Sequence, residues 1–378
     1  MDRDGARLPA EWEAHEGCWL AWPSHAELWE PDLSRVRGEF TALCRAIAGP
    51  QLGAGAETHG AERLRVLVAD HTQARLAAEA LEGLGATLYR VPFGDIWLRD
   101  TGPLFVCDAP TKQRSEASTR PSAKQQGEVR AACFRFNGWG GKYVYAHDDT
   151  VAEAIATSQG SEASRFDWVL EGGAVEVDGQ GTCLTTRDCL LNPNRCHGPD
   201  PQRVERRLAR ALGVSKVLWL SGALANDHTD GHVDTLARFV AHGVVACMEP
   251  CGSEEPNRDV LESVRRQLAS ARDAWGRPLE LVVLPSPGTV LGRSGQVMPA
   301  SYLNFYIANR SLVVPTFGVP QDETALRVLE QCFPGRVVVG IGANALLEGG
   351  GAFHCITQQV PACQAAPASQ RNGTTGAL

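Results

Sequence analysis

The chain has 378 residues and a formal net charge of −8, because 44 Asp and Glu outnumber 36 Lys and Arg. Lys and Arg form no dense run, which argues against a nucleic-acid partner, since phosphate contacts require a basic face. No stretch approaches about 18 uninterrupted apolar residues, so we expect no membrane-spanning helix. The acidic balance suits a cationic small molecule, although many enzymes are acidic.

Twelve cysteines are scattered along the chain without a CxxC pair. A chain of this length can bury a large core and needs no disulfide to stabilise it. The N-terminus carries no apolar run typical of a signal peptide. We therefore expect a cytoplasmic protein with reduced thiols.

Apolar, strand-like runs alternate with amphipathic helical segments along the chain. The run at residues 63–70 precedes a helix whose apolar positions extend over residues 76–84. Three further helices, each followed by an apolar strand, are predicted at residues 204–212 and 214–220, 261–268 and 279–285, and 322–332 and 336–342. Since no long linker separates these units, the sequence predicts a single α/β domain built from several similar modules.

Two segments, residues 51–62 and 108–128, are polar and rich in Ala, Ser and Gly. They hold too few apolar residues to order themselves, and the tail after residue 365 resembles them. We expect mobile surface segments without chemistry at these places. The catalytic domain would then span residues 1–365, with an insertion at 108–128 and a disordered tail at 366–378.

The segment DIWLRDTGP, Asp95–Pro103, could carry chemistry. It is expected to be an apolar strand that ends at Arg99 and Asp100, followed by a turn. A carboxylate at the exit of a buried strand is where α/β proteins commonly place ligands. Alternatively, Asp100 simply begins the turn.

The segment DHTDGHVD places two histidines among three aspartates. In an extended conformation His232 and Asp234 would point to the same face and could serve general acid–base catalysis. A zinc site is the alternative, because His228 and His232 are four residues apart and could bind a metal from a helix. Gly231 disfavours a helix there, and Thr229 stands where an HExxH motif requires Glu.

Glycine runs mark two more candidates. Glu171 precedes two glycines at the head of a hairpin whose turn is predicted at Asp178-Gly179. Cys355 follows His354 and the glycines at 349–351, which leave room for a ligand to approach the main chain. A small buried core cysteine is the ordinary alternative.

Asp100, Glu171, His232, Asp234 and Cys355 together offer one thiol, one imidazole and three carboxylates. The sequence has no phosphate-binding loop and no dinucleotide fingerprint. Such an excess of carboxylates around one nucleophile suits a cationic electrophile, and a planar guanidinium matches carboxylates well.

Seven long motifs resemble those of the agmatine deiminase family, which belongs with the arginine and peptidylarginine deiminases among the guanidine-modifying enzymes. They are LPAEWEAHEGCWLAWP, DIWLRDTGP, FNGWGGKY, LEGGAVEVDGQGT, HTDGHVDTLARF, MPASYLNFYIANRSLVVPTFG and GGGAFHCITQQ. The resemblance implies the pentein fold, a pseudo-symmetric propeller of five ββαβ modules around a central site. It also implies hydrolysis of agmatine to N-carbamoylputrescine and ammonia in polyamine biosynthesis, with no metal or organic cofactor, and often a homodimer.

By the same resemblance, Cys355 is the nucleophile and His232 the acid–base. Asp100 and Asp234 would hold the guanidinium, and Glu171 would orient His232. The thiolate would attack the guanidinium carbon, ammonia would leave, and water would hydrolyse the resulting amidino-thioether.

Several alternatives stay open at this point. Trp97 would line the pocket along the substrate chain, or would only pack in the core. Free or peptidyl arginine could be the substrate, with Arg99 as a candidate partner for its carboxylate. A metallohydrolase using His228 and His232, and a binding module without catalysis, are alternatives from other classes.

Overall fold

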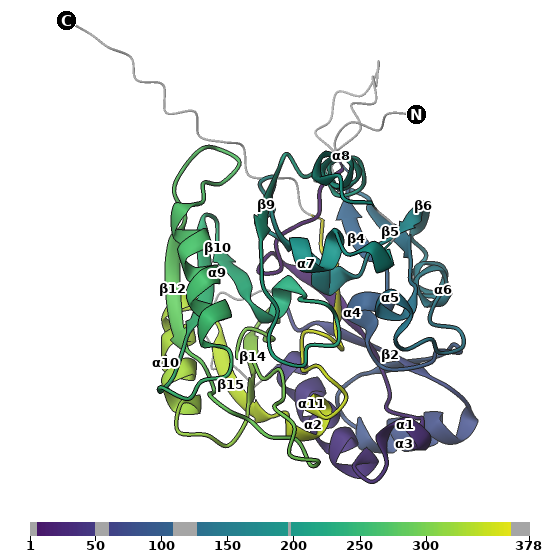
Figure 1. Ribbon diagram of the computed structural model, residues 1–378. Coiled ribbons are helices and arrows are strands. Elements are labelled where there is room, and N and C mark those ends of the chain that lie inside the picture. The colour runs from purple at the N-terminus through teal and green to yellow at the C-terminus, as the bar shows by residue number, and fades with distance from the viewer. Residues whose placement is uncertain (1–5, 50–59, 109–126, 196–197, 364–378) are drawn as a thin grey trace, which may run out of the picture.

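The computed structural model describes residues 6–49, 60–108, 127–195 and 198–363, and Figure 1 shows the arrangement of their helices and strands. The strands form five small sheets, one of four strands and four of three strands. Within these ranges no helix is both long and apolar enough to cross a membrane.

Four sheets repeat one arrangement, in which two antiparallel strands are followed by a helix and then by a third strand parallel to the second. The first of them contains β4 (Leu104–Cys107), β5 (Val129–Arg135), α6 (Val151–Gln159) and β6 (Glu162–Val169). The second contains β7 (Glu176–Val177), β8 (Thr182–Thr186), α8 (Pro201–Leu212) and β9 (Lys216–Leu220). The third contains β10 (Ala237–Ala241), β11 (Val244–Glu249), α9 (Arg258–Ser270) and β12 (Glu280–Pro285). The fourth contains β13 (Tyr306–Ile307), β14 (Ser311–Thr316), α10 (Asp322–Cys332) and β15 (Val337–Gly342).

The fifth sheet joins the two ends of the chain. The C-terminal strand β16 (Gln358–Pro361) pairs antiparallel with β1 (His15–Ala21), and β1 runs parallel to β2 (Arg63–Val68) after helix α2 (Leu33–Ala48). Helix α3 (His71–Ala80) and strand β3 (Thr87–Arg90) extend this sheet. The expected five ββαβ modules of a pentein are therefore confirmed.

Short helical turns connect these modules and position the residues of the site. They are α1 (Ala26–Trp29), α4 (Leu98–Thr101), α5 (Gly138–Gly141), η1 (Gly172–Ala174), α7 (Arg187–Leu190), η2 (Pro193–Arg195), η3 (Val233–Thr235) and α11 (Asn344–Leu347).

Helix α8 illustrates why the predicted helices form where they do. Val204, Leu208 and Leu212 are buried on one face, as their spacing predicts. Asp200 caps the N-terminus by accepting a hydrogen bond from the backbone of Gln202 at 3.0 Å, and Pro201 occupies the first turn. A left-handed glycine ends the helix. The predicted helix at 322–332 also has the expected bounds, whereas α3 ends before residue 84.

One of the segments predicted to be mobile is partly ordered. Glu62, at the end of the 51–62 segment, is buried and accepts hydrogen bonds from the Tyr306 hydroxyl at 2.8 Å and the Asn309 backbone at 2.7 Å. The prediction was wrong for Glu62, because a polar composition does not reveal partners 244 residues away. Residues 51–59, 109–126 and 364–378 lie outside the described residues.

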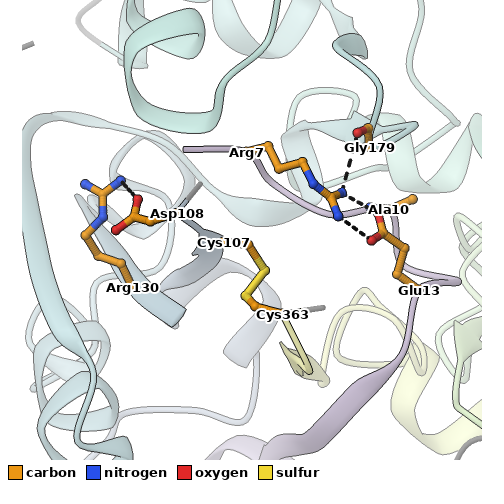
Figure 2. Close-up of a disulfide and its surroundings, with 8 residues drawn as sticks. All are labelled: Arg7, Ala10, Glu13, Cys107, Asp108, Arg130, Gly179 and Cys363. Atoms are coloured by element: carbon orange, nitrogen blue, oxygen red, sulfur yellow. Dashed lines mark hydrogen bonds and ion pairs between the residues drawn. A yellow bond between two sulfur atoms is a disulfide. The ribbon is translucent and has the colours of Figure 1, made fainter. Parts of the chain in front are cut away.

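The expectation of reduced thiols is wrong for one pair of cysteines. Cys107, the last residue of β4, forms a disulfide with Cys363, which follows β16 (Figure 2). Their separation of 256 residues left no pattern in the sequence from which to infer the bond. In the same region Arg7 binds Glu13 at 2.5 and 2.6 Å. Each of the other nine cysteines in the described residues is free.

Candidate active site

A cavity of about 220 Å³ contains the thiol of Cys355 in its wall. The cavity is formed by loops and short helices from distant parts of the chain. Its wall also carries five aromatic and three acidic side chains: Trp29, Trp97, Trp139, Tyr143, Tyr145, Asp95, Asp100 and Glu348. Among the described residues that line it, none is Lys or Arg.

The glycines before Cys355 allow this packing. A Cβ at Gly351 would lie 2.7 Å from the Trp97 ring and 3.0 Å from the sulfur of Cys355. A Cβ at Gly349 would lie 2.5 Å from Trp29 and 2.8 Å from Trp97. Any other residue would thus collide with the walls of the cavity. Trp97, for which pocket lining and core packing were both open, does line the cavity.

Asn304 contacts the thiol and was missed in the sequence. Its Nδ2 donates a hydrogen bond to Sγ of Cys355 at 3.1 Å, while its Oδ1 accepts from the backbone of Ala352 at 3.2 Å. The residue is one of two asparagines in the motif MPASYLNFYIANRSLVVPTFG, and its apolar neighbours indicated nothing about its hydrogen-bond partner.

The groups around Cys355 disfavour its thiolate. Burial, followed by the charges of Asp234 and Asp100, raises the pKa of the Cys355 thiol well above its ordinary value, and the Asn304 hydrogen bond offsets only part of this. The thiol is therefore protonated until a cation neutralises the two carboxylates.

Asp100 lies in the short helix α4, not at the end of a strand as predicted. Its Oδ2 accepts a hydrogen bond from the indole of Trp139 at 2.8 Å, and its Oδ1 accepts from the backbone of Gly173 at 2.9 Å. Trp139, within the motif FNGWGGKY, has a φ of 52°. The carboxylate is thus held in a fixed orientation in the cavity wall.

His232 and Asp234 lie at the start of the 3₁₀ turn η3, so the predicted extended segment is wrong. Both side chains nevertheless converge with the side chain of Asp100 at the Gly173 position. A Cβ at Gly173 would lie 2.6 Å from Nδ1 of His232, 3.0 Å from Oδ1 of Asp100 and 3.0 Å from Oδ2 of Asp234. The second glycine after Glu171 therefore makes room for these three groups to converge.

His232 lies among acidic and thiol groups. Its Nδ1 is 3.7 Å from Oδ2 of Asp100, and ligand-type atoms of His232, Glu171 and Cys189 lie within 4.8 Å of one another. Burial alone would lower the pKa of His232, but Asp100, Cys189 and Glu171 outweigh it and raise that pKa well above the ordinary value. The imidazole can thus carry a proton at neutral pH.

Arg195 holds the buried carboxylate behind His232. Its Nε donates to Oε1 of Glu171 at 2.6 Å, and both side chains are fully buried. Burial still raises the pKa of Glu171 above its ordinary value. Arg195 is a further residue that sequence reasoning missed, because NPNRC showed no link to Glu171.

The predicted residues fall into two layers. Asp100, Trp97 and Cys355 line the cavity, whereas Glu171, His232 and Asp234 are buried behind it. Oδ2 of Asp234 is 3.8 Å from Sγ of Cys355.

Two of the alternatives lose their structural basis. Residues 227–232 form turns, so the helix required to place His228 and His232 on one metal is not formed. Nδ1 of His228 instead lies 3.2 Å from the Tyr143 hydroxyl. Arg99 is buried behind the cavity, where it binds Glu11 at 3.4 Å, and cannot bind a substrate carboxylate there.

Known proteins are similar to this chain in sequence and in the arrangement of modules. The family model described as Porphyromonas-type peptidyl-arginine deiminase matches residues 7–361. The chain belongs to this family. It is 35% identical to a putative agmatine deiminase of Marinomonas sp., covering 95% of each chain, and 35% identical to an agmatine deiminase of Ectopseudomonas mendocina, covering 96% of this chain and 97% of the relative.

A solved structure of a family member has the same fold. The agmatine deiminase of Enterococcus faecalis superposes with a TM-score of 0.83 at 31% identity, covering 97% of this chain and 98% of that one. These names describe the relatives, and the cavity of this chain is the evidence for its own substrate.

Proposed function

We propose that this protein is an agmatine deiminase, which hydrolyses agmatine to N-carbamoylputrescine and ammonia through a covalent intermediate on Cys355. One observation carries the proposal. The Cys355 thiol shares its cavity wall with Asp100, Asp95 and Glu348, and no described Lys or Arg lines that cavity. A substrate with a guanidinium at one end and an ammonium at the other matches this charge pattern.

Binding of the guanidinium prepares the nucleophile. Asp100 and Asp234 lie on either side of the Gly173 position and can each accept guanidinium N–H groups. The substrate charge offsets the two carboxylates that raise the thiol pKa, so Cys355 loses its proton to solvent as agmatine binds. The thiolate then attacks the guanidinium carbon.

His232 supplies the proton for the first half-reaction. The protonated imidazole gives a proton to an unsubstituted nitrogen of the tetrahedral adduct, and the C–N bond breaks to release ammonia. The carbon remains bound to sulfur as an amidino-thioether that carries the aminobutyl chain. Asp100 and Glu171 stabilise the charged imidazole before this transfer.

In the second half-reaction His232 acts as a base instead of an acid. Neutral His232 takes a proton from water, which attacks the amidino carbon. The C–S bond breaks, and N-carbamoylputrescine leaves. The added hydroxyl loses its proton as the carbonyl forms, a proton returns to the sulfur, and the imidazole keeps the proton it took from water, which restores the resting site.

The far end of the cavity favours an ammonium over an amino-acid carboxylate. Oδ2 of Asp95 accepts from the Trp97 indole at 2.8 Å, and Oδ1 accepts from the Trp29 indole at 3.0 Å. Burial raises the pKa of Asp95 to about 6, while hydrogen bonds from Ile96, Trp29 and Trp97 lower it, so the carboxylate is largely ionised at neutral pH. A substrate ammonium would supply the opposite charge, and the aromatic faces would pack on the alkyl chain.

Ammonia release by the purified protein tests the proposal. Agmatine is expected to react at least tenfold faster than free arginine or an arginine peptide, judged by kcat/KM. The Cys355→Ser variant should release no ammonia from any of them. A preference for arginine, or turnover by Cys355→Ser, would contradict the proposal.

The remaining expectations are proposals of the same kind. We propose a cytoplasmic location, an assembly into homodimers and no nucleic-acid partner, with a catalytic domain over residues 1–365. The Cys107–Cys363 disulfide does not favour the cytoplasm, where thiols are usually reduced. Cell fractionation and light scattering would test the location and the assembly.

A further inference from the structure

The residue before the nucleophile, His354, binds a carboxylate at each ring nitrogen. Nδ1 lies 2.7 Å from Oδ2 of Asp234, and Nε2 lies 2.8 Å from Oε2 of Glu11. The side chain is buried, as are both carboxylates. The mechanism above uses His232 for proton transfer and leaves His354 without a role.

The two contacts fit a ring with a proton on each nitrogen. A neutral imidazole has one N–H, so its other nitrogen would face a carboxylate oxygen with a lone pair against a lone pair. An imidazolium donates at both nitrogens, and charge-assisted hydrogen bonds of 2.7–2.9 Å are typical of such pairs. The geometry therefore fits the charged form of His354.

Both acceptors are held as anions. Burial alone would raise the pKa of Glu11, but Arg238, His354 and Arg99 outweigh it and hold that pKa well below its ordinary range. Burial alone would also raise the pKa of Asp234, but the hydrogen bond and charge of His354 help to lower it below its ordinary value.

The charges around His354 are compatible with a protonated ring. Three buried carboxylates face this region, Glu11, Asp234 and Glu176, and two guanidinium groups, Arg99 and Arg238. Arg238 binds Glu11 at 3.0 Å and Glu176 at 2.9 Å, and Arg99 binds Glu11 at 3.4 Å. Outside this set, His232 and the Cys355 thiol also face Asp234. A third cation at His354 matches the three carboxylates, and unbalanced buried charge is costly.

We propose that His354 is a positioning residue, held as an imidazolium between Glu11 and Asp234, which fixes Asp234 for guanidinium binding; the inference rests on the function proposed above. The hydrogen bond occupies Oδ2 of Asp234. The two contacts described for this carboxylate, with Nδ1 of His354 and with Sγ of Cys355, are both made by Oδ2, so His354 orients the oxygen that lies beside the nucleophile and the Gly173 position.

The same contact moderates the charge beside the nucleophile. Asp234 raises the pKa of the Cys355 thiol, and a cation bound to the same carboxylate oxygen reduces its effect. Loss of His354 should therefore weaken agmatine binding and slow thiolate formation together.

Steady-state kinetics of His354→Gln test the positioning role. Gln can donate to one carboxylate but cannot carry a charge between two. We expect KM for agmatine to rise roughly tenfold and kcat/KM to fall by a larger factor, because Asp234 is no longer fixed.

His15→Gln is the matched control. His15 is also buried and binds one carboxylate, with Nδ1 3.1 Å from Oε1 of Glu62, but it makes no described hydrogen bond to Asp234 or to a residue that lines the cavity. Both variants should lose thermal stability, and only His354→Gln should change KM. Equal kinetic effects from the two variants would overturn the positioning role.

Nitrogen NMR of ¹⁵N-histidine-labelled protein tests the charge without substrate. We expect N–H signals from both ring nitrogens of His354 at pH 7, assigned by their loss in His354→Gln. If that variant does not fold, Glu11→Gln gives the assignment by shifting the Nε2 signal. A ring nitrogen of His354 without a proton at pH 7 would overturn the proposal. Failure to turn over agmatine would instead contradict the proposed function and leave this spectrum unchanged.

Discussion

Asn304 donates a hydrogen bond to the sulfur of Cys355 at 3.1 Å and is joined to the same loop through the Ala352 backbone at 3.2 Å. Residues 51 positions apart in the chain are thereby joined at the reacting atom. The donor opposes the effect of burial and of the nearby carboxylates on the thiol.

Asn304→Asp should lower the reactivity of Cys355 more than it lowers the stability of the fold. Asp keeps an acceptor for the loop backbone but replaces the N–H donor by a negative charge, which raises the pKa of Cys355 further. We expect kcat/KM to fall by a factor on the order of 100. The rate of alkylation by iodoacetamide at pH 8 should fall as well. An unchanged alkylation rate would show that Asn304 does not tune the sulfur.

Asp148 should make stability depend on pH. Burial raises its pKa to about 7, and the backbone hydrogen bonds from Gly94 and Asp95 offset this only in part. Because the folded pKa exceeds the unfolded value of about 3.9, folding retains the proton, and the free energy of unfolding falls as pH rises from about 4 to 7.

Asp148→Asn removes this ionisation. It should be more stable than the wild type by about 1 to 3 kcal/mol at pH 8, with a smaller difference at pH 5, in urea denaturation. The neighbouring Asp149 is exposed, so Asp149→Asn is the matched control and should leave the pH dependence unchanged. A constant difference between Asp148→Asn and the wild type at both pH values would contradict the assignment.

The architecture was largely predictable from the sequence, because helical and strand periodicity is local. The helices at residues 201–212, 258–270 and 322–332 and the strands that follow them lie where the apolar patterns predicted. The closure of the fifth sheet by β16 was not predicted, since pairing between the two ends of a chain has no local pattern.

Several residues of the candidate site could be predicted from the sequence, whereas the residues that support them could not. Cys355 and His232 stand in motifs rich in glycine and charge, which draw attention. Asn304, Trp139 and Arg195 stand in apolar or ordinary segments, and their roles depend on partners far away in sequence. Asp100 lines the cavity, but it lies in a helix and not at the predicted strand end.

The disulfide should stabilise the protein without affecting catalysis. Cys107 and Cys363 are absent from the cavity wall, and their bond closes a long loop. Cys363→Ser should lower the free energy of unfolding by about 2 to 4 kcal/mol while leaving kcat/KM at 25 °C unchanged. Reduction of the wild type should reproduce the loss and should have no effect on Cys363→Ser. Equal stability of the oxidised wild type and the variant would contradict the bond.

Asp95 and Glu348 should bind the ammonium group of the substrate. Asp95→Asn and Glu348→Gln each remove one carboxylate from the cavity wall while preserving size. We expect KM for agmatine to rise about tenfold in at least Asp95→Asn, which loses a buried charge–charge contact. Butylguanidine has the same chain without the amine, so its KM should not change. Equal losses for both substrates would indicate general damage to the cavity.

The central claim is that Cys355 attacks the guanidinium carbon of agmatine and that ammonia leaves first. Mass spectrometry of acid-quenched enzyme, followed by peptide mapping, measures this directly. We predict an adduct on the peptide that contains Cys355, with the mass of agmatine less ammonia, which disappears in Cys355→Ser. No adduct during active turnover, or an adduct on a different residue, would contradict the account.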